Sequence, residues 1–172
     1  MSKSPFPIEP WGEDDLPLLH RLLGDPAMME HLGGPESPEK IEERHGRYLG
    51  EHGEGVAKMF KVVDAATGES VGSVGYWERE ADEGQVWETG WMVLPEFQGR
   101  GIASEATRQV IELCRAERTY RYLYAYPSVG NEPSNAICRK IGFELVGAQE
   151  YEYPKASGNI LRCNDWRLDL SR

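Results

Sequence analysis

One stretch, residues 86–106, constrains the fold of this chain more than any other part of its sequence. It reads VWETGWMVLPEFQGRGIASEA, so a hydrophobic run ends near Pro95 and a glycine-containing segment opens a long amphipathic pattern. This order is typical of a strand that passes through a tight loop into a helix. The amides of a first helical turn have no intrahelical partners, and the helix dipole adds positive charge there. Such a loop is therefore suited to bind a pyrophosphate.

The glycines of this loop fit more than one fold. Gly99 and Gly101 let the backbone approach phosphate oxygens without an intervening Cβ, and Arg100 can add a charge-assisted contact. A P-loop would need a lysine that is missing here, and a dinucleotide-binding fingerprint would need a third glycine where Ser104 stands. The glycines alone are also compatible with a simple helix-entry turn.

The remaining sequence predicts helices and strands in a recognisable order. Helical spacing of apolar residues predicts helices over residues 16–23, 37–49, 102–118 and 133–141. Residues 7–11 are expected to form a short extended start. Alternating runs bounded by turn residues predict strands over residues 57–63, 70–77, 85–94, 120–126, 143–153 and 160–170. The order indicates an α/β (α+β) fold, with a mixed sheet covered by helices. At 172 residues, the chain is expected to form a single domain, 1–172.

Two of the helices carry sharper signals. Ser37 and Pro38 are expected at the N-cap and the first helical position of the second helix. The third helix is expected to present one apolar face, made of Ile102, Ala106, Val110, Leu113 and Cys114.

The charge of the chain disfavours one class of partner. Nineteen basic residues against twenty-nine acidic ones give a net charge of −10, which repels nucleic acid phosphates. The same charge attracts cationic ligands such as amines. Acidic residues that only maintain solubility explain it equally simply.

Cysteine and histidine positions argue against a disulfide framework and against a metal site. The three cysteines, at positions 114, 138 and 163, form no CxxC pair, and the four histidines lack metal-ligand spacing at positions 20, 31, 45 and 52. No apolar run approaches the roughly 20 residues that cross a bilayer. The first residues carry no apolar signal segment. We therefore expect a cytoplasmic protein with no bound metal and no membrane association.

Two motifs together resemble one family. Residues 98–103 (QGRGIA) resemble the Q/R-x-x-G-x-G/A signature of the GNAT N-acetyltransferase superfamily. Residues 131–143 (NEPSNAICRKIGF) are similar to its second block, N-x-x-S/A leading to K-x-G-F. Ser134 and the ending NDWRL are most similar to the subgroup that includes ribosomal-protein N-terminal acetyltransferases. The resemblance implies a twisted, mostly antiparallel sheet of six to seven strands, about four helices, and a splay between two central parallel strands.

The resemblance also implies a site for acetyl-CoA. Backbone amides of the signature loop would hold the pyrophosphate, which assigns Gln98, Gly99, Arg100, Gly101, Ile102, Ala103 and Ser104. The backbone of Met92 and Val93 would pair with the pantetheine arm, and one of their amides would polarise the thioester carbonyl. Asn131 would contact the arm or stabilise its own loop as a turn residue.

Glu88 is the predicted general base. A primary amine has a pKa near 10.4, so its proton must be removed before it attacks a thioester. Strand alternation places Glu88, Gly90 and Met92 on one face, and Trp87, Thr89, Trp91 and Val93 on the other. Two alternatives remain open at this stage: an exposed glutamate at a strand end, and an anchor for the substrate ammonium.

The group that protonates the leaving thiolate departs from the family pattern. Many members have a tyrosine where this chain has Cys138, which is interpreted as a small buried residue. The resemblance implies that Ser134 hydrogen-bonds the sulfur, and a helix N-cap is the alternative for this serine. Tyr124 and Tyr126 are weaker candidates for the acid.

The predicted function is acetyl-CoA-dependent N-acetyl transfer to a primary amine by direct attack in a ternary complex. The alternative is an inactive module of the same fold that binds CoA as a sensor. A peptide N-terminus, an amino acid, a polyamine and an aminoglycoside all remain open as acceptors, with net acidity favouring a cationic one. Candidates to line the acceptor pocket are Met28, Met29, Trp77, Tyr151 and Tyr153. Proteins that resemble this family are commonly homodimers.

Overall fold

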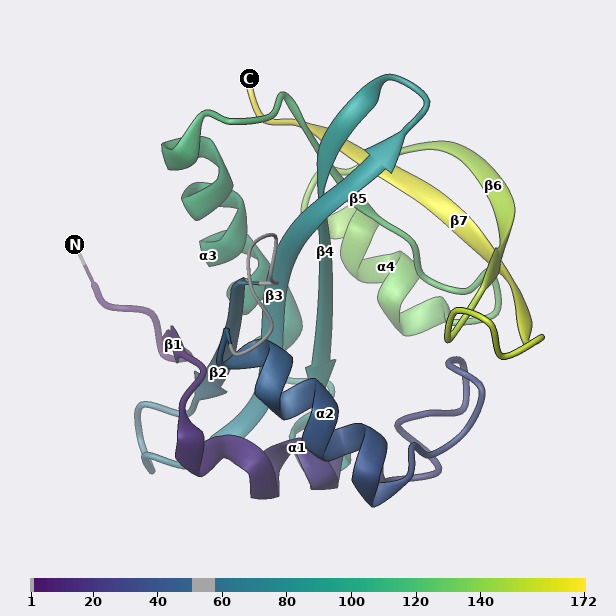
Figure 1. Ribbon diagram of the computed structural model, residues 1–172. Helices are drawn as coiled ribbons and strands as arrows, with labels where there is room; N and C mark the ends of the chain where they lie inside the picture. The colour runs from purple at the N-terminus through teal and green to yellow at the C-terminus, as the bar shows by residue number, and fades with distance from the viewer. Residues whose placement is uncertain (1, 51–57) are drawn as a thin grey trace.

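The computed structural model describes residues 2–50 and 58–172, and Figure 1 shows how their elements are arranged. The strands in these residues are β1 (Ile8–Pro10), β2 (Lys58–Val63), β3 (Ser70–Ala81), β4 (Gly84–Val93), β5 (Tyr122–Ala125), β6 (Glu144–Glu152) and β7 (Ile160–Asp169). The helices are α1 (Leu16–Leu23), α2 (Pro38–Tyr48), α3 (Ile102–Glu117) and α4 (Glu132–Lys140), with 3-10 turns η1 (Glu13–Asp15) and η2 (Pro95–Phe97).

Most predicted elements are confirmed, and their boundaries differ where pairing decides them. Strand β3 continues past the predicted end at Trp77, because its residues pair with β4 as far as Ala81 opposite Gly84. Strand β5 is shorter than predicted, at Tyr122–Ala125. The predicted start of β2 at Ala57, like His52, lies outside the described residues. In α2 the N-cap prediction is confirmed, since the Ser37 side chain accepts a hydrogen bond from the amide of Lys40.

The seven strands form one mixed sheet in the order β1-β2-β3-β4-β5-β7-β6. Every neighbouring pair is antiparallel except β4 and β5, which are parallel. Strand β4 pairs with β3 along its whole length, from Gly84 to Val93. It pairs with β5 only at Trp87 and Glu88. Beyond these two residues the parallel strands part, so the predicted splay and the predicted fold class are confirmed.

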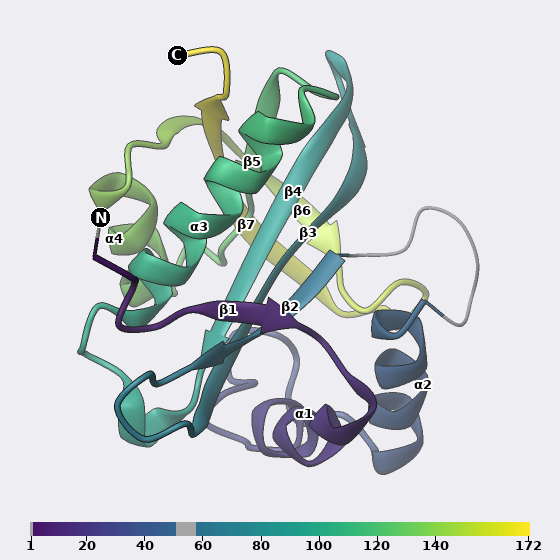
Figure 2. The ribbon, with the colours of Figure 1, turned by 90° about the vertical axis from the view of Figure 1, so that its left-hand side faces the viewer.

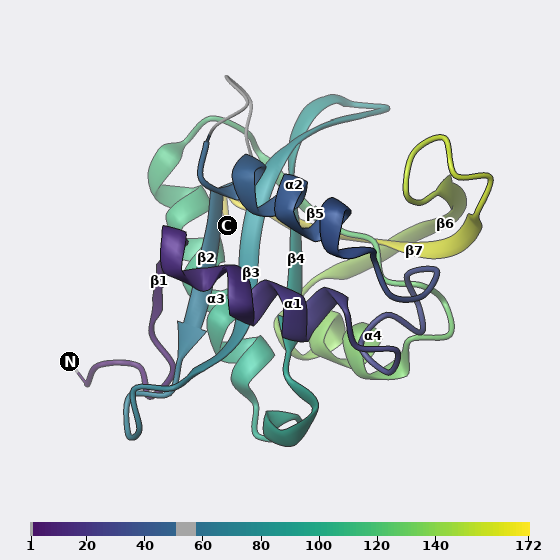
Figure 3. The ribbon, with the colours of Figure 1, turned by 60° about the horizontal axis from the view of Figure 1, so that its bottom comes forward.

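Helices cover both faces of the sheet. Figure 2 shows α3 and α4 over one face, and Figure 3 shows α1 and α2 lying together over the other. Each layer has its own apolar core. The core beneath α3 includes Val110, Leu123 and Trp166, whereas the core beneath α1 and α2 includes Leu22, Ile41 and Leu94.

One prediction about α3 is wrong. Leu113 lies at the margin of the apolar face and is 36% exposed, whereas Ile111, which was not assigned to that face, is buried. The other predicted members are buried: Ile102, Ala106, Val110 and Cys114. No helix in the described part of the chain is long and apolar enough to cross a membrane.

Candidate active site

The splay places one edge of β4 free of strand partners. Leu94 donates its amide hydrogen to Val71 on β3, so the carbonyl of Val93, across the same peptide plane, points away from β3 and toward the splay. There it accepts a hydrogen bond from the Gln98 side-chain amide at 2.9 Å. The carbonyl of Met92 instead lies against Gly72 on β3. Of the two residues predicted to meet the donor, Val93 therefore turns its backbone to the splay.

The signature loop leads directly from this strand to the N-terminus of α3. Gly99 and Gly101 have φ angles of +79° and +76°, and nothing lies within 4 Å of where a Cβ would be at either residue. Gly101 is the N-cap of α3, so the first-turn amides that follow it have no intrahelical acceptor. Ile102 and Ser104 are buried, whereas the loop residues before them, 98–101, are exposed. An exposed loop with these features fits a pyrophosphate.

The side chain of Arg100 has protein partners. Its Nη2 lies 3.7 Å from the carboxylate of Asp64, which is buried. Its guanidinium also lies 5.6 Å from the ring centroid of Phe6. A phosphate contact from Arg100 would have to share this guanidinium with Asp64.

Glu88 lies at the point where β4 and β5 part. It is the last residue of β4 that pairs with β5, opposite Tyr124. Its side chain is only 15% exposed and accepts a hydrogen bond from Arg79 Nη1 at 2.9 Å. The alternative of an exposed glutamate at a strand end is therefore wrong. Trp87 and Thr89 on the opposite face are buried, which confirms the alternation.

Arg79 joins Glu88 to two tyrosines. Its guanidinium carbon lies 4.3 Å from the ring centroid of Tyr126 and 4.9 Å from that of Tyr151. Burial by itself lowers the pKa of Arg79, but the charge of Glu88 and the hydrogen bond to it dominate, so its pKa is raised. The Tyr151 hydroxyl donates to the buried carboxylate of Asp165 at 2.7 Å. No pattern in the sequence indicates Arg79 or Asp165, because the pairing of β3 with β4 brings Arg79 to Glu88 and the pairing of β6 with β7 brings Asp165 to Tyr151.

The start of α4 differs from the prediction. Asn131 is the N-cap, and its side-chain oxygen accepts a hydrogen bond from the amide of Ser134 at 3.3 Å. The N-cap interpretation of Ser134 is therefore wrong, and the helix begins at Glu132. Ser134 is partly buried and occupies the third helical position, so its hydroxyl is not needed to cap the N-terminus of α4.

Asn135 is a positioning residue that sequence analysis missed. Its side chain is 1% exposed and donates to the carbonyls of Ser128 and Asn131. Its carbonyl oxygen accepts from the Asn164 side chain and the Trp166 indole, both at 2.8 Å. These bonds tie α4 to β7 and to the loop that leaves β5. An asparagine after a capping motif was the available signal, but it carries no information about its distant partners.

The candidate proton donors have distinct environments. Burial raises the pKa of the Cys138 thiol to about 12, and the side chain is completely buried, so the interpretation as a buried residue is confirmed. Burial and the neighbouring Glu83 raise the pKa of Tyr124 to about 12, and its hydroxyl donates to Glu83. Burial also raises the pKa of Tyr126. Among the described hydrogen bonds of these candidates, an acidic partner is found for Tyr124 and not for Ser134 or Tyr126.

The predicted acceptor-pocket residues do not form one group. Met29 is completely buried in the core beneath α1 and α2. The sulfur of Met28 lies 3.6 Å from the Gln98 side-chain nitrogen, beside the signature loop. The Tyr153 hydroxyl accepts a hydrogen bond from Arg44 on α2 at 3.3 Å, and thus joins the β6–β7 turn to that helix.

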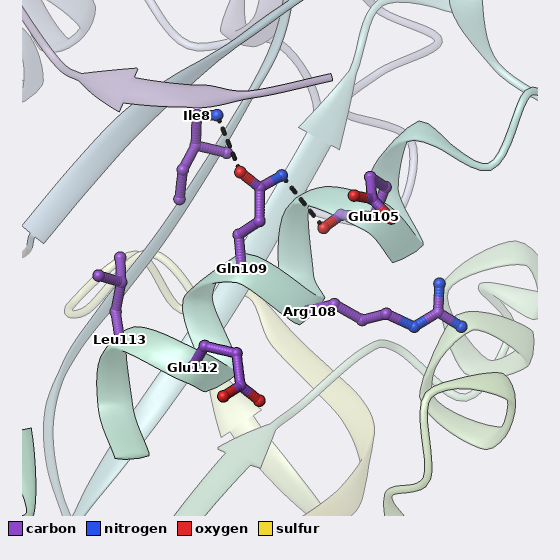
Figure 4. A pocket seen from close by; sticks show the side chains of 6 residues that line it. All are labelled: Ile8, Glu105, Arg108, Gln109, Glu112 and Leu113. Atoms are coloured by element: carbon purple, nitrogen blue, oxygen red, sulfur yellow. Dashed lines mark hydrogen bonds between the residues drawn. The ribbon is translucent and has the colours of Figure 1, made fainter. Parts of the chain in front are cut away.

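Two surface hollows lie away from the splay. One, of about 370 Å³, lies between β1 and the outer side of α3, where Gln109 binds the amide of Ile8 and the carbonyl of Glu105 (Figure 4). The other, of about 300 Å³, lies between the end of α1 and Pro95. Neither is lined by Glu88 or by Ser134. Among residues 2–50 and 58–172, no group of three histidine, cysteine or acidic side chains is placed to hold a metal.

Comparison with known proteins places this geometry in a family. The model of the acetyltransferase (GNAT) domain matches residues 7–144. An uncharacterized Bacillus subtilis protein, YkkB, is 28% identical over 130 residues, which are 75% of each chain.

Solved structures show the same fold. Spermidine N-acetyltransferase from Vibrio cholerae, in complex with CoA and spermine, has a TM-score of 0.78 at 20% identity, covering 98% of each chain. A Salmonella typhimurium acetyltransferase that modifies the N-terminal serine of ribosomal protein L7/L12 has a TM-score of 0.79 at 22% identity. That match covers 97% of this chain and 96% of the other. With its family model, signature loop and splayed sheet, the chain belongs to the GNAT acetyltransferase family.

Proposed function

We propose that this acetyltransferase moves an acetyl group from acetyl-CoA to a primary amine, by direct attack while both substrates are bound. The observation that carries the proposal is the position of Glu88, a shielded carboxylate where the parallel strands part. The same strand continues into the signature loop at the N-terminus of α3. A base and a donor site thus lie along one short segment of chain.

The donor site is built mainly from backbone. The pyrophosphate lies against the amides of residues 98–104, where positive φ angles at Gly99 and Gly101 shape the loop. The pantetheine arm follows the free edge of β4 at Val93, whereas the Met92 carbonyl faces β3, so the predicted backbone pairing at Met92 is not part of the proposal. Asn131 supports the opposite side by capping α4. The fit rests on the exposure of residues 98–101 and on the open space at both glycines.

The chemistry requires three groups beside the splay. Glu88 takes a proton from the acceptor ammonium, whose nitrogen then bonds to the thioester carbonyl carbon. The amide of Val93 stabilises the negative charge that develops on the carbonyl oxygen. The carbon–sulfur bond breaks and the sulfur leaves with the electron pair, stabilised by a hydrogen bond from the Ser134 hydroxyl. The second proton, which the nitrogen loses as the amide forms, goes to this thiolate and completes the CoA thiol. No covalent acyl-enzyme is needed, and the buried Cys138 is unsuited to form one.

The reaction is proposed to take place in the cytoplasm. The three cysteines are free and buried, which fits the reducing cytoplasm. Structural neighbours act on spermidine and on a ribosomal protein, so amines of both sizes belong in an acceptor panel. The chain is proposed to act as a single domain without metal or nucleic acid. A homodimer stays a prediction from the family resemblance.

The test is thiol release from acetyl-CoA by the purified protein, across amino acids, polyamines, aminoglycosides and peptides with free N-termini. Turnover with one acceptor class that is sharply reduced by Glu88→Gln supports the proposal. Isothermal titration with acetyl-CoA is run in parallel. Failure to bind acetyl-CoA would overturn the proposed donor. Binding with turnover unaffected by Glu88→Gln would remove Glu88 from its role as base.

A further inference from the structure

Arg79 has guanidinium N–H donors that no described hydrogen bond uses, on the face of the sheet that carries Glu88. It lies on β3 opposite Val86, and its side chain shares a face with that of Glu88. A guanidinium has five N–H donors, and the described residues give Arg79 one hydrogen bond, to a single oxygen of Glu88. Its side chain is 31% exposed. The group can therefore bind a second carboxylate, or exchange its present one.

Two tyrosines fix the orientation of this guanidinium. The rings of Tyr126 and Tyr151 lie 4.3 and 4.9 Å from its central carbon. Tyr151 is itself held by Asp165, through a hydrogen bond of 2.7 Å. A guanidinium held by aromatic faces presents its edge in a defined direction, which suits two parallel hydrogen bonds to a carboxylate.

The charges around Arg79 do not suit a polycation. Glu88 is neutralised by Arg79, and Asp165 accepts hydrogen bonds from Tyr151 and Gln149. Glu83 accepts from Tyr124 and lies 4.0 Å from Arg167. These three carboxylates already have partners, so they offer no row of free negative charges to an extended polyamine.

We propose that the acceptor is an α-amino acid, whose carboxylate binds Arg79 and whose amine faces Glu88. This inference rests on the proposed function. The acceptor carboxylate replaces Glu88 as the partner of Arg79, and the released Glu88 accepts the proton of the amine. Arg79 and Glu88 are in direct contact. An acceptor that binds to both must therefore carry its carboxylate and its amine close together. In an α-amino acid both groups are attached to one carbon, so the spacing matches.

Arg79 is then the residue that determines acceptor specificity. A polyamine has no anionic group for the guanidinium. A peptide N-terminus has its carboxyl carbon in an amide bond, which carries no charge. Both would have to bind while Glu88 stays in its ion pair, so both are expected to be poor acceptors.

The experiment compares each amino acid with its own amide and its decarboxylated amine. Thiol release from acetyl-CoA gives kcat/KM, and isothermal titration gives affinity for the CoA-bound protein. The wild-type protein is expected to favour the acid over the amide by at least about tenfold, as expected for one charged contact. In Arg79→Met this ratio falls to within about twofold, Arg79→Lys keeps an intermediate ratio, and the control Arg121→Met keeps the full ratio.

Several outcomes overturn the proposal while acetyl transfer itself stands. One is equal use of acid and amide by the wild-type protein, and another is a preference that survives Arg79→Met. A third is acetyl-CoA binding without binding or turnover of any carboxylate-bearing amine. Acetyl-CoA affinity separates these outcomes from failure of the proposed function, because Arg79 variants are expected to leave it unchanged. If acetyl-CoA does not bind to the wild-type protein, both proposals fall together.

Discussion

Glu88 on β4 and Tyr124 on β5 are register partners, and they form the last pair before the two parallel strands part. Beyond this pair β4 keeps its bonds to β3 and has a free edge on the other side. The proposed base therefore lies at the inner end of the splay, on the face opposite α3 and α4. In the proposed reaction the donor approaches along this strand edge, and the acceptor meets it from the face that carries Glu88.

Replacing Glu88 by glutamine should separate catalysis from donor binding. We expect kcat to fall by about 10² to 10⁴, since a positioned base contributes a factor of that size. The affinity for acetyl-CoA should stay within about twofold, because the residues proposed to bind it lie elsewhere. Thiol release and titration calorimetry measure the two quantities. The exposed Glu80 on β3 provides the matched control, Glu80→Gln, which should leave both unchanged.

Gly101→Ala should weaken acetyl-CoA binding. A side chain at a φ of +76° costs about 1 kcal/mol, and relief of that strain would move the amides at the start of α3. Gly68→Ala is the control, because Gly68 has nearly the same φ, +75°, and equally open surroundings. Urea unfolding should show a similar loss of stability in both variants. Only Gly101→Ala should raise the Kd for acetyl-CoA, and an equal rise in both would argue against the loop as the donor site.

Asn131→Ala should mainly reduce stability, whereas Ser134→Ala should mainly reduce kcat. Asn131 caps α4, so its removal should lower the free energy of unfolding by about 1 kcal/mol. Ser134→Ala should change stability by less than about 0.5 kcal/mol, as for substitutions that remove no structural bond. Its kcat should fall, because the leaving sulfur loses a hydrogen bond. Ser134→Ala with a large loss of stability and an unchanged kcat would assign the serine to the helix alone.

Asn135→Ala should be among the most destabilising polar substitutions at this site. It leaves the buried indole N–H of Trp166 without its acceptor, which costs about 1–3 kcal/mol. It also frees the loop at Ser128, so acetyl-CoA affinity should fall together with stability. The control Asn164→Ala removes one of the same bonds but leaves the indole bonded. Denaturation that follows the same curve in Asn135→Ala and wild type would show that the network contributes little.

Stability should decrease in alkaline solution. Burial raises the pKa of Cys114 and Cys138 from 9.0 to about 12, so folding favours their protonated forms. This contribution is complete below about pH 9, falls as the pH rises, and is lost once the pH passes the folded value near 12. The slope approaches about 1.4 kcal/mol per pH unit for each thiol. Urea midpoints measured from pH 8 to 11 should fall less steeply in Cys114→Ala/Cys138→Ala than in wild type.

Local sequence patterns determined much of the fold and of the loop proposed to bind the donor. The strand, glycine loop and amphipathic helix around residues 86–118 predict their own backbone, because turn chemistry and apolar spacing act over a few residues. The same patterns placed Glu88 on the face opposite Trp87, as the structure shows. Two short motifs predicted the family, and the match of the family model to residues 7–144 confirms it.

Long-range pairing decided what the sequence left open. Arg79 meets Glu88 because β3 and β4 pair in one register, and Asn135 meets Trp166 because α4 packs beside β7. Only the full sheet shows that β5 leaves β4 after two residues. A hydrogen bond between residues that are distant in the chain depends on the relative positions of whole elements, and a local pattern carries no record of these. The sequence by itself therefore determined the elements and the glycine loop, whereas the tertiary structure decided which charged and aromatic side chains lie around Glu88 and Arg79.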